Sequence, residues 1–202
     1  MARRSDHSRD EIQAMAIQAA IAILSTEGLH GLSTRKVASA IGYTVGTLYL
    51  VFKNLDELIL HVNAAALDDL RTVMQAELVS VDDPQDQLLA LARAYLQFAR
   101  DNFARWSLMF THQMPEGMSL PDWFHDKVRG LFALVVKPLQ HINPGLNEAQ
   151  YQQATHVLWS SVHGVCELGL NDKLTLGGEI QAEDLIDALV KNYLKGFTQG
   201  WD

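Results

Sequence analysis

One segment of the chain, residues 32–58, limits the possible folds more than any other: LSTRKVASAIGYTVGTLYLVFKNLDEL. Ser33 stands where a helix N-cap is expected, ahead of a short helix with apolar residues on one side. Gly42 ends this helix in a tight turn, and Thr44 can cap a second short helix over residues 45–50. These features predict a helix-turn-helix, whose second helix can enter the major groove of DNA.

Composition and length predict a globular, all-α protein. Of the 202 residues, 48% are apolar and 20% are charged, and alternating β-type runs are missing. No uninterrupted apolar run approaches the roughly 18 residues of a membrane helix. No apolar run follows the N-terminal arginines within signal-peptide range, so no signal peptide is expected. The single cysteine, Cys166, excludes an internal disulfide and suits a reducing compartment. We therefore expect a cytoplasmic protein with no membrane partner.

The net charge of −8 argues against a general nucleic-acid binder, but the charge is unevenly distributed. Residues 1–60 carry as many basic as acidic side chains, so the negative excess belongs to the rest of the chain. The basic residues of the N-terminal part can form a positive face for phosphate: Arg3, Arg4, Arg9, Arg35, Lys36 and Lys53. Charge alone fits equally well an ordinary acidic protein with a neutral N-terminal part.

Helical periodicity predicts two domains. Ser8 and Glu11 form a capping-box pattern that starts a first helix, and Gly28 is expected to end it. This helix would pack against residues 29–52 to form a three-helix head. A helix over residues 55–79, about 37 Å long, is too long for the head and is expected to extend into a second domain as a strut. Further helices are expected over residues 84–101, 105–112, 121–142, 151–168 and 180–197. The predicted domains are residues 1–54, which bind DNA, and residues 55–202, a helical bundle for ligand binding and dimerisation.

Residues 9–60 resemble the DNA-binding domain of the TetR family of transcriptional regulators. The matching residues are Ser33-Thr34-Arg35-Lys36-Val37-Ala38, Gly42-Tyr43-Thr44-Val45-Gly46-Thr47-Leu48-Tyr49, Phe52-Lys53-Asn54 and Leu58. The helical remainder agrees with the family in length, and Trp159, His163 and Gly164 resemble a W…H-G element of some C-terminal domains. The resemblance implies a homodimeric, ligand-responsive regulator, most often a repressor, that a small-molecule effector releases from a palindromic operator.

The resemblance also implies which residues contact DNA: Thr34, Arg35, Thr44, Val45, Gly46, Thr47, Tyr49 and Lys53. Their chemistry suits this role, since hydroxyls at helix N-termini can bind phosphate and Arg35 can reach a guanine edge or a phosphate. Val51 and Leu55 depart from the family, which often has His and Lys there, so some phosphate contacts are missing or come from the basic N-terminal arm. The alternative function is therefore a helical small-molecule-binding protein that has lost DNA binding. An enzyme is not expected, because no nucleophile elbow, phosphate loop, metal quartet or carboxylate pair is present.

The second domain is rich in aromatic and thioether side chains, and the resemblance implies a ligand cavity among them. The expected ligand-binding residues are Tyr95, Phe98, Trp106, Phe110, Met114, Trp123, His125, Trp159 and His163. For any single aromatic side chain, tight core packing is favoured over a place in the lining of a cavity. The last two helices carry apolar faces wide enough for a two-fold interface, so they are expected to form the homodimer. His156, Ser160, His163 and Glu167 share one helix face; a dimer face or a solvated stripe is favoured over a metal site, and no metal or cofactor is expected.

Overall fold

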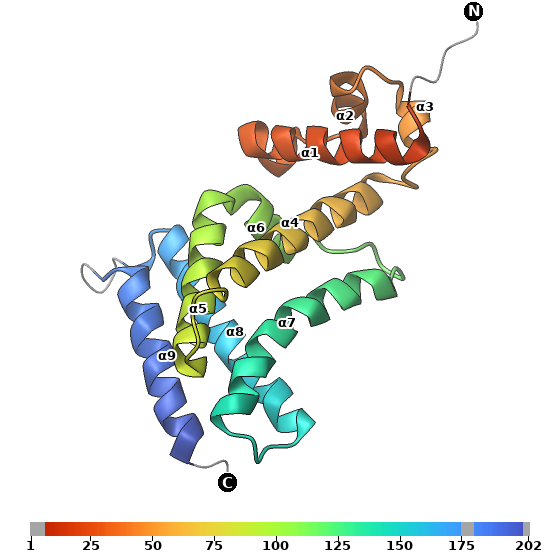
Figure 1. Ribbon diagram of the computed structural model, residues 1–202. Coiled ribbons are helices and arrows are strands. Elements are labelled where there is room, and N and C mark those ends of the chain that lie inside the picture. The colour runs from red at the N-terminus through yellow and green to blue at the C-terminus, as the bar shows by residue number, and fades with distance from the viewer. Residues whose placement is uncertain (1–6, 175–179, 200–202) are drawn as a thin grey trace, which may run out of the picture. The chain divides into compact units, whose positions relative to one another are not determined.

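The computed structural model describes residues 7–174 and 180–199, and every regular element in these ranges is an α-helix (Figure 1). The all-α class expected from the sequence is confirmed. The described helices are α1 (Arg9–Gly31), α2 (Thr34–Ala40), α3 (Val45–Leu48), α4 (Leu55–Glu77), α5 (Pro84–Asp101), α6 (Phe103–Thr111), α7 (Asp122–Ile142), α8 (Glu148–Leu170) and α9 (Ala182–Gln199).

The chain forms two compact units, and each unit is built from two separate segments. Unit 1 comprises Met1–Ala66 and Ala104–Pro121, whereas unit 2 comprises Leu67–Phe103 and Asp122–Asp202. Helix α4 therefore contributes its first half to unit 1 and its second half to unit 2, as expected for a strut. Compact units need not coincide with functional domains, so the boundary between residues 54 and 55 stays a prediction.

Unit 1 is organised around the buried side of α1. Its core takes one face of α1 together with apolar side chains from α2, α3, the first half of α4 and α6: Ile12, Ala16, Ala20, Leu24, Val37, Leu48, Phe52, Leu58, Val62 and Leu108. Leu108 lies in α6, more than forty residues beyond the rest of this core, so no pattern within the head could place it there. The three-helix head thus includes a later helix of the chain.

Local signals in the sequence explain both ends of α1. The hydroxyl of Ser8 accepts a hydrogen bond from the Glu11 N–H, and the Glu11 carboxylate accepts one from the Ser8 N–H. These bonds lower the pKa of Glu11. Gly28, the expected end of this helix, has φ +67° inside α1, and about one more turn follows it up to Gly31. The regular helix is therefore interrupted at Gly28, the glycine expected to end it, and α1 continues beyond it to Gly31.

Helix α1 is also the one described helix that is long and apolar enough to cross a membrane by length and composition alone. The sequence expectation concerned uninterrupted apolar runs, and it still holds because polar residues such as Gln13 and Gln18 interrupt those of α1. Its Ile12, Ala16, Ala20 and Leu24 are buried in the core of unit 1, and core helices of soluble proteins pass the same test.

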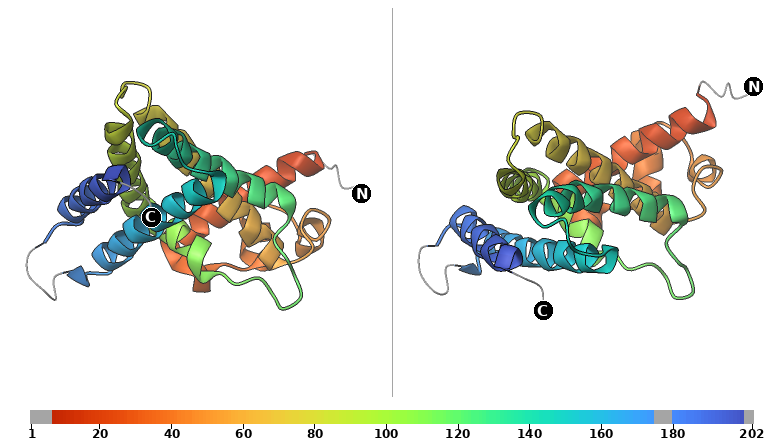
Figure 2. Two further views of the ribbon diagram at one scale, coloured as in Figure 1. Left: turned by 90° about the horizontal axis from the view of Figure 1, so that it is seen from below. Right: turned by 60° about the horizontal axis from the view of Figure 1, so that its bottom comes forward.

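Unit 2 is a helical bundle in which α9 packs against α5 and α8, and α7 packs against the same two helices (Figure 2). Arg93 of α5 donates two hydrogen bonds to the Asp187 carboxylate of α9, and the Arg100 guanidinium lies 2.7 Å from Glu183. These arginines lower the pKa of both carboxyl groups. Two exposed ion pairs therefore fix α9 along α5, although each adds little stability.

Candidate functional site

The second motif helix, α3, presents a surface with few free hydrogen-bonding groups. Thr44 caps the helix, since its hydroxyl accepts a hydrogen bond from the Thr47 N–H, and the two threonine hydroxyls lie 3.0 Å apart. Gly46 adds no side chain, and a Cβ there would meet only the Thr44 hydroxyl at 3.7 Å. Val45 is half-buried against the unit 1 core. This short helix can therefore approach another surface closely.

Buried side chains on one side of α3 force their neighbours outward on the other side. Leu48, Val51 and Phe52 are buried, with 1%, 8% and 3% of their surfaces exposed. Tyr49 lies between these anchors and is 54% exposed, so its phenol is available to a partner. The helix ends at Leu48 rather than at residue 50, and the residues after it continue as turns whose N–H groups bond to carbonyls three or four residues back.

The structure gives a physical reason for the two departures from the family pattern. Val51 is part of the unit 1 core, and Leu55 packs against that core at the start of α4. Both positions therefore serve packing in this chain. Asn54 caps α4 by accepting the Glu57 N–H at 2.8 Å, and the Glu57 carboxylate accepts the N–H of Lys53. The exposed Lys53 is thus held at a fixed turn next to the motif.

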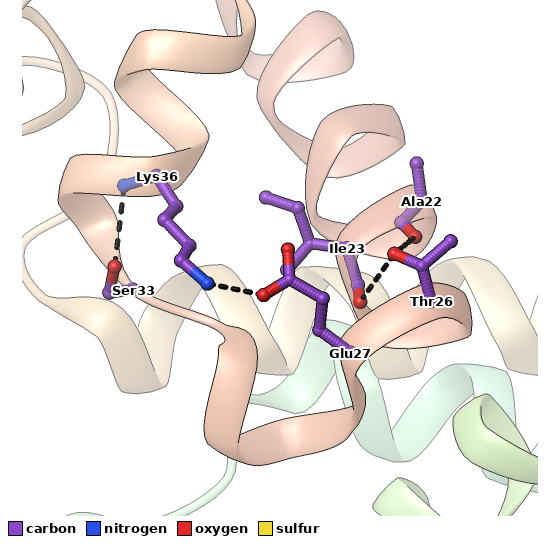
Figure 3. Close-up of polar contacts among 6 residues, drawn as sticks. All are labelled: Ala22, Ile23, Thr26, Glu27, Ser33 and Lys36. Carbon is purple, nitrogen blue, oxygen red and sulfur yellow. Dashed lines mark hydrogen bonds and ion pairs between the residues drawn. The ribbon is translucent and has the colours of Figure 1, made fainter.

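The first motif helix, α2, offers one exposed arginine and one lysine that is already paired. Ser33 caps α2 by accepting the N–H of Lys36, as the sequence predicts. The Lys36 ammonium forms an ion pair with Glu27 at the C-terminal end of α1 (Figure 3). Arg35 is exposed, and Thr34 at the N-terminus of α2 is half-buried. Lys36 therefore contributes less free positive charge than the sequence suggests.

His7, the first described residue, lies next to the turn of the motif. The Nδ1 atom of His7 lies 2.8 Å from the Tyr43 hydroxyl, and the two rings meet edge to face. Arg3 and Arg4, which the sequence assigns to a basic arm, lie outside the described residues.

In unit 2, the structure brings three of the predicted ligand-binding residues together. The buried Tyr95 of α5 places its hydroxyl 3.0 Å from Nδ1 of His163 on α8. Trp159 stacks on His163 with 5.6 Å between ring centroids. Phe132 of α7 touches both Trp159 and His156. Phe132 is not among the predicted ligand-binding residues, because spacing within α8 does not reveal which residue of α7 faces that helix.

The other predicted ligand-binding residues do not join this cluster. Trp106 and Phe110 belong to α6 in unit 1, where Trp106 is fully buried and the two rings lie 5.4 Å apart. Met114 lies in the loop after α6. Trp123, an expected ligand-binding residue, is 37% exposed in the first turn of α7, and His125 is also exposed.

Phe98 of α5 is buried in unit 2. A groove of about 310 Å³ between α7 and α8 is lined by Val136, Gln140, Glu148, Tyr151 and Gln152, none of them predicted. The nine predicted residues thus remain a prediction that only Tyr95, Trp159 and His163 support as a group.

Burial lowers the pKa of His163, and the charge of Glu167 opposes this effect. Because the folded chain favours the neutral imidazole, the contribution of His163 to stability is complete above the unfolded-state pKa of about 6.5. This contribution is lost as the pH falls below that value towards the lower pKa of the folded state. We expect urea unfolding to show a larger loss of stability from about pH 7.5 to about pH 5.5 in the wild type than in His163→Gln. A matched Gln153→Ala variant, at an exposed residue of α8 that carries no titratable group, should lose as much as the wild type. Equal losses in the His163→Gln variant and the wild type would contradict this role.

Two features of α8 that could carry chemistry are Cys166 and the helix face with His156, His163 and Glu167. Burial raises the pKa of the Cys166 thiol to about 12, so the thiolate that oxidation or metal binding requires is scarce. In residues 7–174 and 180–199, no three His, Cys, Asp or Glu side chains gather as a metal-binding group.

The outer side of α8 combines exposed apolar residues with small ones. Val157 and Leu168 are 41% and 48% exposed, and Ser161 and Gly164 lie between them at helical spacing. A Cβ built at Gly164 meets nothing within 4 Å, and the same holds for Gly196 of α9. This face, the α8 stripe (Val157, Ser161, Gly164 and Leu168), permits a close approach of another helix.

Comparison with known proteins points to one family for both parts of the chain. A sequence model described as "Bacterial regulatory proteins, tetR family" matches residues 16–62. A second, described as "Tetracyclin repressor-like, C-terminal domain", matches residues 88–193, just over half of the chain. The HTH-type transcriptional regulator Rv1816 of Mycobacterium tuberculosis (strain ATCC 25618 / H37Rv) is 32% identical over 117 residues, which are 57% of this chain and 50% of the relative. The chain thus spans about half the length of this curated relative.

Solved structures share the fold over nearly the whole chain. The regulator SCO7222, a TetR from Streptomyces coelicolor, has a TM-score of 0.71 at 18% identity and covers 96% of this chain and 98% of its own. RolR, solved in complex with resorcinol, has a TM-score of 0.67 at 16% identity and covers 93% and 88%. At such identities, the likeness concerns the fold alone.

Proposed function

Because this chain belongs to the TetR family of transcriptional regulators, which bind DNA and are not enzymes, we propose that it acts as a homodimer on a palindromic operator. Its role is that of a repressor in the cytoplasm. Two heads about 34–36 Å apart would read two half-sites on the same side of the duplex. The α8 stripe and the adjacent side of α9 supply the dimer interface.

The single observation that supports DNA contact best is the outward face around α3. Tyr49 is exposed there although its neighbours Leu48 and Val51 are buried, and the exposed Arg35 and Lys53 belong to the same unit. Tyr49 offers a hydroxyl to a phosphate, and the two basic side chains add charge. The proposed contact set remains Thr34, Arg35, Thr44, Val45, Gly46, Thr47, Tyr49 and Lys53.

We further propose that a small-molecule effector binds unit 2 and releases the operator. The cluster of Tyr95, Trp159 and His163 offers ring surfaces together with a hydroxyl and an imidazole, which suits an effector with an aromatic ring and a polar group. RolR, a structural neighbour, was solved with the aromatic molecule resorcinol. Because α4 belongs to both units, a shift in its second half would move the first half of the same helix. A coupling of about 1–3 kcal/mol would weaken operator binding by about 5–150-fold.

The salt dependence of DNA binding tests the proposed face. Each lost phosphate contact makes the negative slope of log K against log salt shallower by about 0.9, so Arg35→Gln combined with Lys53→Gln should make it shallower by about 3.6 in a dimer. Fluorescence anisotropy with a labelled duplex at several salt concentrations measures this slope. Lys36→Gln is the matched control, since the Lys36 ammonium is already paired with Glu27 and its loss should leave the slope near that of the wild type.

The same titration separates the two functions considered for the chain. If the wild type binds no duplex in a salt-dependent manner, the proposal fails and the alternative of a small-molecule-binding protein without DNA binding takes its place. If the wild type binds but the double variant keeps the full slope, the contacts lie on another face of unit 1.

A further inference from the structure

We propose that Leu50 is a specificity-determining residue that packs against the C5-methyl group of a thymine in each operator half-site. This inference rests on the proposed DNA binding and adds a residue outside the contact set given above. It also names the chemical feature that the residue recognises, which is an apolar methyl group rather than a hydrogen-bonding base edge.

The backbone around Leu50 holds its side chain away from the protein. Leu50 is 73% exposed, whereas Leu48, Val51 and Phe52 are buried. The N–H of Leu50 donates to the carbonyl of Thr47 at 3.2 Å, and the N–H of Val51 donates to that of Leu48 at 2.9 Å. Buried residues on both sides of Leu50 therefore fix the direction in which it points.

Single exposed leucines are common on protein surfaces and need no function. Leu50 differs because it adjoins the exposed Tyr49 and lies three residues before the exposed Lys53, on the face proposed to contact DNA. An apolar side chain beside a phenol and an ammonium group fits a partner with phosphates at the rim and an apolar group within. The major groove of DNA has this arrangement wherever it carries a thymine.

The neighbouring side chains also favour an apolar contact. The hydroxyls of Thr44 and Thr47 bind each other at 3.0 Å, and Gly46 has no side chain. The face around α3 therefore has few groups that could form the paired hydrogen bonds that distinguish one base from another. Leu50 is the long aliphatic side chain on this face that is free to reach a base.

Replacing thymine by deoxyuracil tests the inference, because the exchange removes the methyl group and keeps every hydrogen-bonding atom. The operator is first obtained by selecting wild-type binding sites from random duplexes. Uracil at the contacted thymine should weaken wild-type binding about fourfold per half-site, or about fifteenfold in a symmetric site. Leu50→Ala should bind the thymine operator more weakly than the wild type does and should respond less than twofold to uracil, since the contact is already lost.

Val79→Ala is the matched control, because Val79 is 86% exposed and follows α4 in unit 2, where no DNA contact is proposed. This variant should keep the full response to uracil. The inference is overturned if Leu50→Ala responds to uracil as the wild type does, or if no thymine-to-uracil exchange affects the wild type. A wild type that binds no duplex at all overturns the proposed function as well, which distinguishes the two failures.

Discussion

Replacing Gly164 by glutamate is expected to convert the proposed dimer into a monomer and to lower operator affinity by about a hundredfold or more. A Cβ at Gly164 meets nothing within 4 Å in the protomer, so a side chain can leave the helix there without a clash at its first atom. In a two-fold interface through the α8 stripe, however, the side chain would separate the closely packed helices and bring two negative charges together. The loss in affinity follows because two linked half-site contacts become one.

Light scattering after size-exclusion chromatography measures the mass, and anisotropy measures the affinity. Helix content should not fall, because glutamate has a higher helix propensity than glycine. Gly145→Glu is the matched control, since Gly145 is exposed in the turn between α7 and α8, and this variant should remain dimeric. A dimeric Gly164→Glu variant with wild-type affinity would place the interface on another surface.

Replacing Phe52 by alanine is expected to destabilise the protein by about 3–5 kcal/mol. Phe52 is 3% exposed in the core of unit 1, and its ring meets that of His61 edge to face at 5.5 Å. Truncation removes this contact and leaves a cavity below the face that presents Tyr49. For a chain of this length, the loss corresponds to a fall in Tm of roughly 6–20 °C.

Differential scanning calorimetry or a thermal melt followed by circular dichroism measures this change. Leu50→Ala is the control. It also truncates a large apolar side chain, but Leu50, two residues before Phe52, is 73% exposed. Its Tm should stay within about 2 °C of that of the wild type. Similar Tm values for the two variants would contradict the burial pattern on which the outward direction of Tyr49 and Leu50 depends.

Local signals predicted the helices well because caps act within a few residues of the chain. Ser33 and Thr44 cap α2 and α3 as the sequence predicts, and Asn54 caps α4 in the same way, so short-range signals set the helix starts at residues 34, 45 and 55. The ends were less predictable. For example, α3 stops at Leu48, because the next residues form tighter turns that periodicity alone cannot distinguish from helix.

The candidate site was predictable in kind but not in arrangement. The sequence indicated an aromatic second domain, and Tyr95, Trp159 and His163 do meet there. Their neighbour Phe132 and the placing of Trp106 in unit 1 depend on which helices pack together, which spacing within one helix cannot reveal. The ion pair between Lys36 and Glu27 was not predictable either, because it joins two helices. The backbone changes direction at Gly28, between these two residues.

The return of the chain to unit 1 through α6 limits how this protein can be divided. An N-terminal fragment that stopped after α4 would lack Leu108 and expose the apolar wall that this side chain covers. A chimaera made by exchanging the head between relatives at a single junction would likewise combine the head of one protein with the α6 of another. Such chimaeras need two junctions, so that the head and α6 come from the same relative.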